Sequence, residues 1–447
     1  MGHVDANELL AEGGGYGAQP TVAFVTLGCA KNEVDSAAMV DRVQAAGFTV
    51  SDDPRSADAV VVNTCSFIQA ATEESLQTIF EISGLPGYDD GSKRIVVAGC
   101  LPARYGEDLE QDLTEASAFV PCSRESDIVE VLADLLGAPA RIEGGASRKA
   151  GDFFGTVARY VKISDGCDRF CSFCAIPYIR GAYHSFQFKD IRDEVSRLVL
   201  DGAREITLIA QDTGRWGEDL NPEDTTASLL ERLADEFADT WFRLMYVEPA
   251  GVTDQLLETI ASHPNICSYL DVPLQHASAK VLDSMNRSGS YEENLALIRR
   301  IRAKVPGITL RTTVIAGFPG ETEEDFDLLV DFLEEAEFDY VGVFAYSREE
   351  GTRAASLPDQ VDEDVKAERA QTLRDVADSI SHARVASRAG QSMDVLVLGR
   401  EEDGQLYGRA MCQAPDVDGV TYLESGEPGD VVRIVIEDTL LYEMEGA

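Results

Sequence analysis

The chain has 447 residues, of which 44% are hydrophobic, enough for about three domains with cores of their own. No run of 18 apolar residues occurs, so we expect no membrane-spanning segment. The 38 Lys and Arg residues stand against 80 Asp and Glu residues, a formal charge of −42. Such a surface repels nucleic acid and attracts a basic partner, although a general adaptation to salt or solubility is the alternative explanation.

The start of the chain does not resemble a secretion signal. The first twenty residues contain no basic segment followed by a hydrophobic one, so we expect a cytoplasmic protein. In that compartment clustered cysteines bind metals or perform chemistry more often than they form disulfides. The five histidines show no ligand-type spacing, so a histidine-based metal centre is not expected.

Residues 20–137 are predicted to form an open parallel α/β sheet. Apolar, β-branched runs followed by helical patterns occur at 21–29, 57–65 and 93–100, and a weaker run lies at 117–122. The first three runs end in Cys29, Cys65 and Cys100. Because the carboxyl ends of parallel strands share one edge of the sheet, we expect these three thiols to meet in one crevice.

Three other cysteines are interpreted as structural thiols. Cys122 ends the weaker fourth run and could share the same edge, but its strand is the least certain of the four. A small buried thiol is the commoner role, and the same interpretation applies to Cys267 and Cys412.

A Gly- and Ala-rich stretch at 137–152 is predicted to be a linker, and a second β/α series follows it. Its six strand-like runs lie at 157–164, 204–211, 241–248, 267–273, 308–317 and 340–347. Six parallel units fit either an open sheet or an incomplete (β/α) barrel. In both architectures the working face lies at the carboxyl ends of the strands.

The loop "DGCDRFCSFC", residues 165–174, directly follows the first of these strands and carries Cys167, Cys171 and Cys174. A 4Fe–4S cube has four irons, each normally bound by one thiolate, so three cysteines leave one iron open to a ligand. The alternatives are a zinc site that borrows a distant ligand, and plain thiols.

The last part of the chain changes character. A polar amphipathic helix pattern at 359–389 precedes five short strand-like runs, which predict a small all-β barrel of the oligonucleotide-binding type. Residues 388–447 contain four Arg and no Lys against thirteen Asp or Glu, a balance of −9. We therefore expect this barrel to bind nucleic acid poorly and a basic protein well.

These motifs together resemble a known family. The three-cysteine loop after the first barrel strand resembles the radical S-adenosylmethionine (SAM) enzymes. With "LGCAKNEVDS", "VNTCSFIQAATEES", "VAGCLPARY", "PLQHAS" and "GFPGETEEDF", the chain resembles their methylthiotransferase branch, closest to the RimO family. The MiaB-like tRNA adenosine methylthiotransferases are the alternative, but they typically have GCQMN where residues 28–32 here are GCAKN. A non-catalytic iron–sulfur carrier is a further alternative.

The resemblance implies three domains. These are an N-terminal methylthiotransferase domain at 20–137, an incomplete (β/α)6 radical SAM barrel at 153–385 and an OB-like TRAM barrel at 386–447. It also implies two 4Fe–4S clusters and SAM as cofactors. Cys167, Cys171 and Cys174 would hold the radical SAM cluster, and Cys29, Cys65 and Cys100 the second cluster. The implied cofactor contacts are Phe173, Gln211, Asp212, Gly317, Pro319 and Gly320, with no catalytic residue beyond the cluster ligands.

The implied activity is insertion of a methylthio group at the β-carbon of an aspartate in small-subunit ribosomal protein S-twelve. Reductive cleavage of SAM would give a radical that removes hydrogen from this unactivated carbon, and the second cluster would present the sulfur. The strand-end faces of the two α/β domains would then have to face one another. The implied partners are the basic ribosomal protein, free or on the small subunit, and an electron donor such as flavodoxin or ferredoxin.

Two positions depart from the family pattern. Phe186 stands where the family usually has Arg, so an ionic contact would have to come from elsewhere, for example from Arg180. Glu248 stands in "YVEPAG", where an aromatic-rich version is expected.

Overall fold

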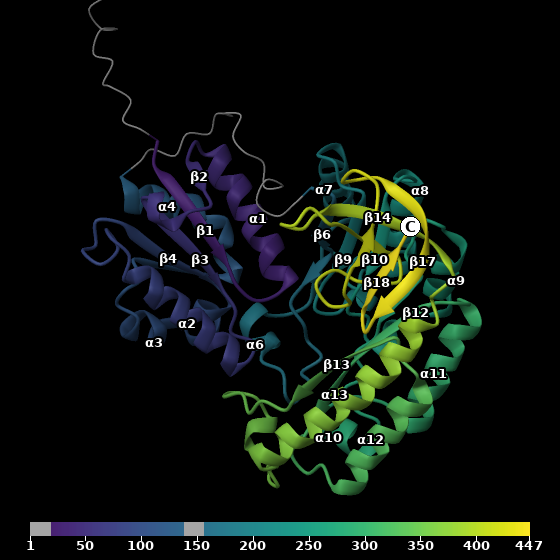
Figure 1. The fold of residues 1–447 in the computed structure, drawn as a ribbon. Helices are drawn as coiled ribbons and strands as arrows, with labels where there is room; N and C mark the ends of the chain where they lie inside the picture. The colour runs from purple at the N-terminus through teal and green to yellow at the C-terminus, as the bar shows by residue number, and fades with distance from the viewer. Residues whose placement is uncertain (1–18, 138–155) are drawn as a thin grey trace, which may run out of the picture. The chain divides into compact units, whose positions relative to one another are not determined.

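The computed structural model describes residues 19–137 and 156–447 (Figure 1). The predicted linker therefore lies outside the described residues except for Gly137. Contacts divide the described chain into two units. The first is built from residues 19–28, 35–65 and 73–137, and the second from 29–34, 66–72 and 156–447.

The first unit is built on a parallel sheet of five strands. In chain order they are β1 (Thr21–Thr26), β2 (Thr49–Ser51), β3 (Ala59–Thr64), β4 (Arg94–Gly99) and β5 (Ala118–Pro121). The order across the sheet is β2-β1-β3-β4-β5, and every neighbouring pair is parallel. The four predicted strands are confirmed. The three-residue β2 at the edge was not predicted, because it is too short to show a periodic pattern.

Helices cover both faces of this sheet (Figure 1). They are α1 (Ala30–Ala45), α2 (Gln69–Ser83), α3 (Cys100–Asp112) and α4 (Ile128–Leu136). Ile79 and Ile82 of α2 and Leu101 of α3 pack against Val60 and Val62 of the central strand. Both faces of β3 are buried, which explains why its sequence is continuously apolar instead of alternating.

The second unit contains the six predicted strands of the β/α series, arranged as two parallel three-stranded sheets. One sheet is ordered β10 (Trp241–Leu244), β9 (Glu205–Ile209), β6 (Ala158–Lys162). The other is ordered β11 (Tyr269–Asp271), β12 (Thr309–Ala316), β13 (Tyr340–Ala345). A single parallel bridge between Phe242 and Ile266 links the two sheets. The arrangement is an incomplete barrel.

Helices alternate with these strands. They are α6 (Ile176–Arg180), α7 (Phe188–Leu200), α8 (Thr226–Glu236), α9 (Asp254–Ser262), α10 (Ala279–Ser284), α11 (Tyr291–Lys304) and α12 (Glu323–Ala336). The starts of α8 and α12 are fixed by capping boxes, in which Thr225 and Thr322 accept a backbone N–H of the first turn. A short antiparallel pair, β7 (Ser164–Asp165) and β8 (His184–Ser185), flanks the cysteine loop.

The C-terminal part is a closed five-stranded barrel, as predicted. The strands, in order around the barrel, are β14 (Ser392–Arg400), β15 (Leu406–Ala410), β16 (Thr421–Leu423), β18 (Glu443–Gly446) and β17 (Val431–Leu440). The long helix α13 (Glu363–Ala386) leads into it and contacts β13 and α12 (Figure 1).

Buried ion pairs join this barrel to the β/α sheets. Arg409 Nη2 lies 2.7 Å from Glu205 Oε2, and Arg243 Nε lies 2.8 Å from Glu205 Oε1. Burial alone would raise the pKa of Glu205, but the two guanidinium groups outweigh it and hold that pKa below its ordinary value.

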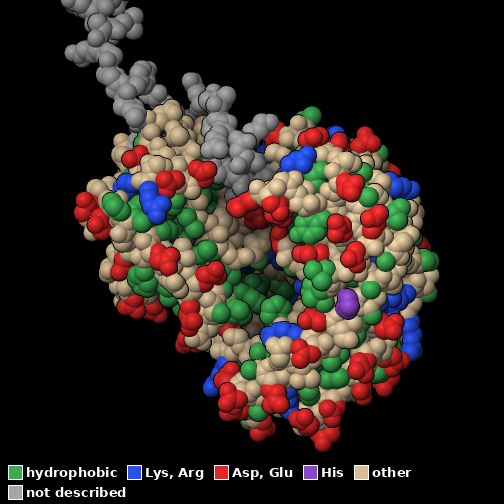
Figure 2. Space-filling model, viewed as in Figure 1, with side chains coloured by type: hydrophobic (Ala, Val, Ile, Leu, Met, Phe, Trp, Pro, Cys, Tyr) green, Lys and Arg blue, Asp and Glu red, His purple; other side chains and the backbone are tan. Residues whose placement is uncertain are grey.

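Across the described residues, no helix combines the length and apolar character needed to cross a membrane. Acidic side chains are spread over the face shown in Figure 2, as the composition leads one to expect.

Candidate functional site

The three-cysteine loop lies directly after β6 and β7, at the carboxyl end of the first barrel strand. Backbone hydrogen bonds fix it on several sides. The Cys167 amide donates to the Gly181 carbonyl at 3.0 Å, and the Cys174 amide donates to the Cys171 carbonyl at 3.0 Å. Ser172 donates from its amide to Met285 and accepts from the Ala354 amide. The loop is therefore anchored to segments more than a hundred residues away along the chain.

The backbone conformation of the loop is unusual at two positions. Gly166 has a φ of +72°, and a Cβ there would lie 2.2 Å from the Ala182 carbonyl oxygen, so only glycine fits. Phe170, between two of the cysteines, has a φ of +49° and is 54% exposed. A bulky residue in the left-handed region costs energy and is typical of functional loops.

All three thiols are half-buried. Burial raises the pKa of Cys174 to about 12 and also raises the pKa of Cys167, so isolated thiolates are disfavoured there unless a cation offsets their charge. Among the described residues, no three His, Cys, Asp or Glu side chains are grouped closely enough to hold a single metal ion. A cube spreads its ligands more widely, since each thiolate binds its own iron.

Positive charge lies beside the loop. Arg287 Nη1 donates to Cys171 Sγ at 3.8 Å, and Arg287 Nη2 lies 3.5 Å from Glu248 Oε1. Glu248 Oε2 lies 3.3 Å from Arg169 Nη2. The unexpected carboxylate at 248 therefore pairs with two arginines next to the thiols, a role that only the folded chain shows.

Two buried acceptors near the loop have no hydrogen-bond partner. They are Gln211 Oε1 and Asp212 Oδ1, both at the carboxyl end of β9. The other oxygen of Asp212 accepts from Arg169 Nε at 2.9 Å, which ties this residue to the cysteine loop. Burial raises the pKa of Asp212 in spite of that arginine. Buried acceptors without partners are costly unless a ligand supplies the donor, so this pair suits an ammonium group. Both residues were predicted to contact the cofactor.

The "GFPGE" segment after β12 is folded back on itself. Glu321 Oε2 accepts the Gly317 amide at 2.9 Å, and Glu321 Oε1 lies 2.7 Å from Arg369 Nη1. A Cβ on Gly317 would lie 2.4 Å from Lys366 Cγ, so the close approach that this glycine permits is to α13. Pro319 is buried, whereas a Cβ on Gly320 would meet no atom within 4 Å. The cofactor contacts predicted for this segment remain predictions.

Phe173 is partly buried and packs against a small cluster that includes Phe318 and Tyr346. The rings of Phe318 and Tyr346 meet edge-to-face with centroids 5.4 Å apart. The Tyr346 hydroxyl is buried and has no hydrogen-bond partner. Sequence reasoning missed Tyr346, because "YVGVFAYS" shows only that it ends the sixth strand. An apolar side chain beside an unused hydroxyl suits a flat, partly polar ligand.

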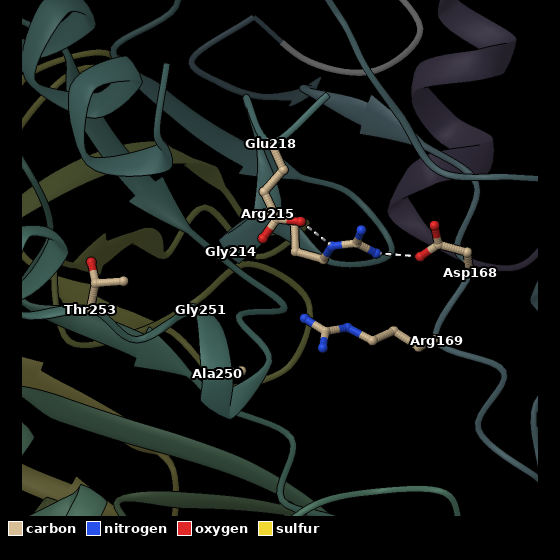
Figure 3. Close-up of a pocket in the computed structure, with 8 residues that line it drawn as sticks. All are labelled: Asp168, Arg169, Gly214, Arg215, Glu218, Ala250, Gly251 and Thr253. Atoms are coloured by element: carbon tan, nitrogen blue, oxygen red, sulfur yellow. Dashed lines mark hydrogen bonds and ion pairs between the residues drawn. The ribbon is translucent and has the colours of Figure 1, made fainter. Parts of the chain in front are cut away.

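A polar cavity of about 500 Å³ lies next to the cysteine loop (Figure 3). Its lining residues are Asp168, Arg169, Gly214, Arg215, Glu218, Ala250, Gly251 and Thr253. Arg215 bridges Asp168 and Glu218, with Arg215 Nε 2.8 Å from Glu218 Oε2. Gly214 and Gly251 touch backbone to backbone, since a Cβ on Gly251 would lie 2.7 Å from the Gly214 Cα. The cavity is therefore shaped by two tight turns and bordered by paired charges.

Phe186 stands where the family usually has Arg, and Arg180 is the suggested alternative source of an ionic contact. The Phe186 ring packs against the barrel core, and its carbonyl accepts Trp216 Nε1 at 3.0 Å. Arg180 Nη1 lies 3.3 Å from Asp165 Oδ2, just before the cysteine loop. Arg180 thus provides a positive charge next to the start of the cysteine loop.

Each of the three cysteines predicted for the second cluster follows a strand of the five-stranded parallel sheet. Cys65 and Cys100 come directly after β3 and β4 and are 8% and 4% exposed, whereas Cys29 follows β1 by three residues and is exposed. The interpretation of Cys122 as a buried thiol after a doubtful strand is wrong. β5 forms, Cys122 is half-buried, and its Sγ lies 3.9 Å from Cys100 Sγ. Cys267 is buried as expected, whereas the prediction of a buried residue is wrong for Cys412, which is of intermediate exposure.

Family comparisons agree with this architecture. Residues 21–121 match an uncharacterized protein family (UPF0004), residues 161–333 match the Radical SAM superfamily, and residues 389–447 match the TRAM domain. Among solved structures, the radical SAM methyltransferase TsrM from Kitasatospora setae is similar with a TM-score of 0.55 at 16% identity, over 73% of this chain and 72% of that one. The radical SAM enzyme OxsB is similar with a TM-score of 0.51 at 13% identity, over 80% of this chain and 56% of its own. These likenesses concern the fold alone.

Curated relatives match nearly the whole chain. The ribosomal protein uS12 methylthiotransferase RimO of Trichlorobacter lovleyi is 41% identical over 96% of this chain and 98% of its own. RimO of Geobacter sulfurreducens is 40% identical over the same shares. RimO of Clostridioides difficile is 38% identical over 95% of this chain and 98% of its own. The chain therefore belongs to the RimO family of radical SAM methylthiotransferases.

Proposed function

We propose that this protein transfers a methylthio group to the β-carbon of an aspartate in ribosomal protein uS12, using two 4Fe–4S clusters and SAM. The observation that supports the proposal is that a loop with three half-buried thiols follows β6 and β7, while two buried acceptors without partners follow β9, one of them tied to the loop through Arg169. The RimO relatives, which match the chain over nearly its full length, support the same activity.

In this proposal Cys167, Cys171 and Cys174 hold the radical SAM cluster. The cluster and SAM together supply the radical chemistry needed to remove hydrogen from a carbon that no base could deprotonate. Gln211 Oε1 and Asp212 Oδ1, which are buried and have no hydrogen-bond partner, would accept hydrogen bonds from the SAM ammonium group. Arg287 stabilises the thiolate charge at Cys171 from 3.8 Å. Phe173 gives SAM an apolar contact.

Cys29, Cys65 and Cys100 hold the second cluster in this proposal. Support comes from the sheet topology, because the three cysteines follow β1, β3 and β4, which are consecutive in the sheet. Gly99 holds Cys100 in place, since a Cβ on Gly99 would lie 2.2 Å from Asn63 Oδ1. The open iron of this cluster would present the sulfur to the substrate carbon.

The acidity of the chain supports a basic protein substrate. The C-terminal barrel carries −9 over residues 388–447, and the whole chain carries −42. A polyanionic tRNA would be repelled by such a surface, whereas a basic ribosomal protein would be attracted to it. We infer a small electron-transfer protein such as flavodoxin or ferredoxin as the electron donor.

The proposal is tested by anaerobic reconstitution with iron and sulfide, followed by incubation with uS12, SAM and a reductant. We expect uS12 to gain the mass of one methylthio group on an aspartate, located by tandem mass spectrometry. Cys171→Ala should lose the activity, and Cys267→Ala should keep it, because Cys267 lies in the core away from both sites. Modification of tRNA adenosine in place of uS12 would contradict the substrate, and SAM-independent cluster release would indicate a carrier.

A further inference from the structure

A fourth cysteine follows a strand of the five-stranded parallel sheet. The strands β1, β3, β4 and β5 are consecutive across the sheet, and they are followed by Cys29, Cys65, Cys100 and Cys122 in the same order. Gly99 of β4 is paired in register with Pro121 of β5, and Cys100 and Cys122 are the residues that directly follow this last pair. Family reasoning assigns a role only to the first three cysteines.

The sulfurs of Cys100 and Cys122 lie close enough for a disulfide bond to be considered. Cys100 is the first residue of α3 and Cys122 the first residue of a short 3-10 helix, so both directly follow the last paired residues of two neighbouring strands. The two sulfurs are 3.9 Å apart, and a disulfide bond needs about 2.05 Å. Side-chain rotation can supply the difference while the backbone stays in place.

The two thiols differ in access. Cys100 is 4% exposed, whereas Cys122 is of intermediate exposure. We expect a reagent in solution to react first with Cys122, the more exposed residue of the pair.

We propose that Cys100 and Cys122 form a disulfide in the cluster-free protein and that this bond withdraws Cys100 from the second cluster. The part that concerns the cluster rests on the proposed function, whereas the disulfide itself does not. A small-molecule disulfide such as oxidised glutathione is the oxidant.

The chemistry proceeds in two thiol–disulfide exchanges. The Cys122 thiolate attacks glutathione disulfide, forms a mixed disulfide and releases one glutathione thiolate. The Cys100 thiolate then attacks the Cys122 sulfur of that mixed disulfide, forms the Cys100–Cys122 bond and releases the second glutathione thiolate. The two cysteine protons end on the two glutathiones, so two cysteine thiols are oxidised and one glutathione disulfide is reduced. When Cys100 binds iron, its sulfur is unavailable for the second exchange, so the bound cluster protects the pair.

The competing partner for Cys100 is Cys65. Thr64 of β3 is paired in register with Gly99, so Cys65 also directly follows a strand that neighbours β4. The Cys65 backbone amide and carbonyl are both engaged by the Ser75 hydroxyl, which holds the Cys65 backbone in place. The 3.9 Å contact between the sulfurs of Cys100 and Cys122 is the observation on which the choice of Cys122 rests.

The first experiment maps the disulfide without any cluster. The full-length chain with Cys167, Cys171 and Cys174 replaced by Ala is freed of iron, incubated with oxidised glutathione, alkylated and digested. We expect mass spectrometry to find a linked peptide joining Cys100 and Cys122, and its loss in the same chain carrying Cys122→Ser. A bond between Cys65 and Cys100, or alkylation of both Cys100 and Cys122, would overturn the proposal.

The second experiment measures iron uptake by the same chain after oxidation. We expect the oxidised parent to take up almost no iron until dithiothreitol is added, and the Cys122→Ser variant to load without reduction. Cys412→Ser is the matched control and should behave as the parent does. Equal uptake by the oxidised parent and the Cys122→Ser variant would overturn control of loading by the pair. If the reduced parent takes up no iron, the second cluster itself is refuted. The peptide mapping of the first experiment tests the disulfide independently, so the two failures can be told apart.

Discussion

Glu248 is paired with two arginines beside the three-cysteine loop. Its carboxylate lies between Arg169 and Arg287, and Arg287 reaches Cys171 Sγ. The negative charge of Glu248 offsets two cations that would otherwise favour the more negative, reduced form of a bound cluster. Glu248, which departs from the family pattern, thus lies where its charge would affect the reduction potential of a cluster bound by the loop.

We expect Glu248→Gln to raise the midpoint potential of the barrel cluster by on the order of tens of millivolts. The variant removes the charge but keeps a side chain of the same size. The measurement is a redox titration followed by electron paramagnetic resonance, on protein whose second cluster is removed by Cys65→Ala. Glu218→Gln, which alters a carboxylate paired with Arg215 instead, is the control and should shift the potential less. A negative shift in Glu248→Gln would contradict this assignment.

Asp418 is a second residue with a measurable consequence. It is fully buried, it accepts the Tyr269 hydroxyl and the Ala414 amide, and burial raises its pKa to about 6. Because the folded pKa lies above the ordinary value of 3.8, the folded state is favoured when Asp418 is protonated. This contribution is complete below about pH 4 and is lost as the pH rises through 6.

Asp418 should lower the free energy of unfolding of the parent as the pH rises from 4 to 7. Asp418→Asn should not show this part of the decrease, because Asn does not ionise. We expect the free energy of unfolding of the variant, relative to the parent, to improve by on the order of 2–3 kcal/mol across this range. Urea unfolding at a series of pH values, on cluster-free protein, measures the difference. Parallel pH profiles for parent and variant would show that Asp418 does not titrate in this range.

At the scale of elements, the cysteine loop depends on a turn that only glycine can make. Gly166 combines a φ of +72° with a Cβ position 2.2 Å from the Ala182 carbonyl oxygen. Both the strained dihedral angle and the clash with the backbone oppose any side chain there. The loop, and with it the spacing of the three thiols, is held by this contact with the β8 side of the hairpin.

Gly166→Ala should lower the free energy of unfolding by about 2 kcal/mol or more and should reduce iron retention by the barrel site. Gly351→Ala is the matched control, because Gly351 has a φ of +81° but no atom within 4 Å of the added Cβ. We expect this control to cost only about 1 kcal/mol and to retain iron. Chemical denaturation and iron analysis provide the two readouts. Equal losses in the two variants would mean that the Ala182 contact contributes nothing.

Most elements could be predicted from the sequence, and the exceptions have physical causes. The apolar runs of β3, β4 and β12 are long and fully or nearly fully buried, so their patterns are unambiguous. β2 has only three residues and pairs at the sheet edge, so no periodicity marks it. The run before Cys122 is short and only partly buried, and its status as a strand depends on pairing with β4.

At the scale of the whole molecule, the net negative charge is expected to influence which partners associate with the protein. A formal charge of −42 predicts repulsion of nucleic acid and attraction of a basic protein, over distances set by the salt concentration. The membership of the RimO family was predicted from motifs and is confirmed by relatives that match nearly the whole chain. If uS12 is the substrate, electrostatic attraction should raise the rate at which it associates with this protein.

We expect the association rate with uS12 to fall roughly tenfold between 50 mM and 500 mM salt, because exposed charges are screened. Surface plasmon resonance with immobilised uS12 measures this rate. Bulk tRNA, tested at the same salt concentrations, should bind weakly throughout. Tight tRNA retention that weakens with salt would point to a basic surface that the composition does not provide.

The sequence by itself determined the family, the strand-end cysteines and the acidity of the C-terminal barrel, because local spacing and β/α periodicity are properties of contiguous residues. Only the tertiary structure decided which distant groups meet. The 3.9 Å contact between Cys100 and Cys122, the pairing of Glu248 with two arginines, and the unpartnered acceptors of Gln211 and Asp212 all depend on strand register and packing. Register and packing are set by many side chains together, so no single stretch of sequence contains that information.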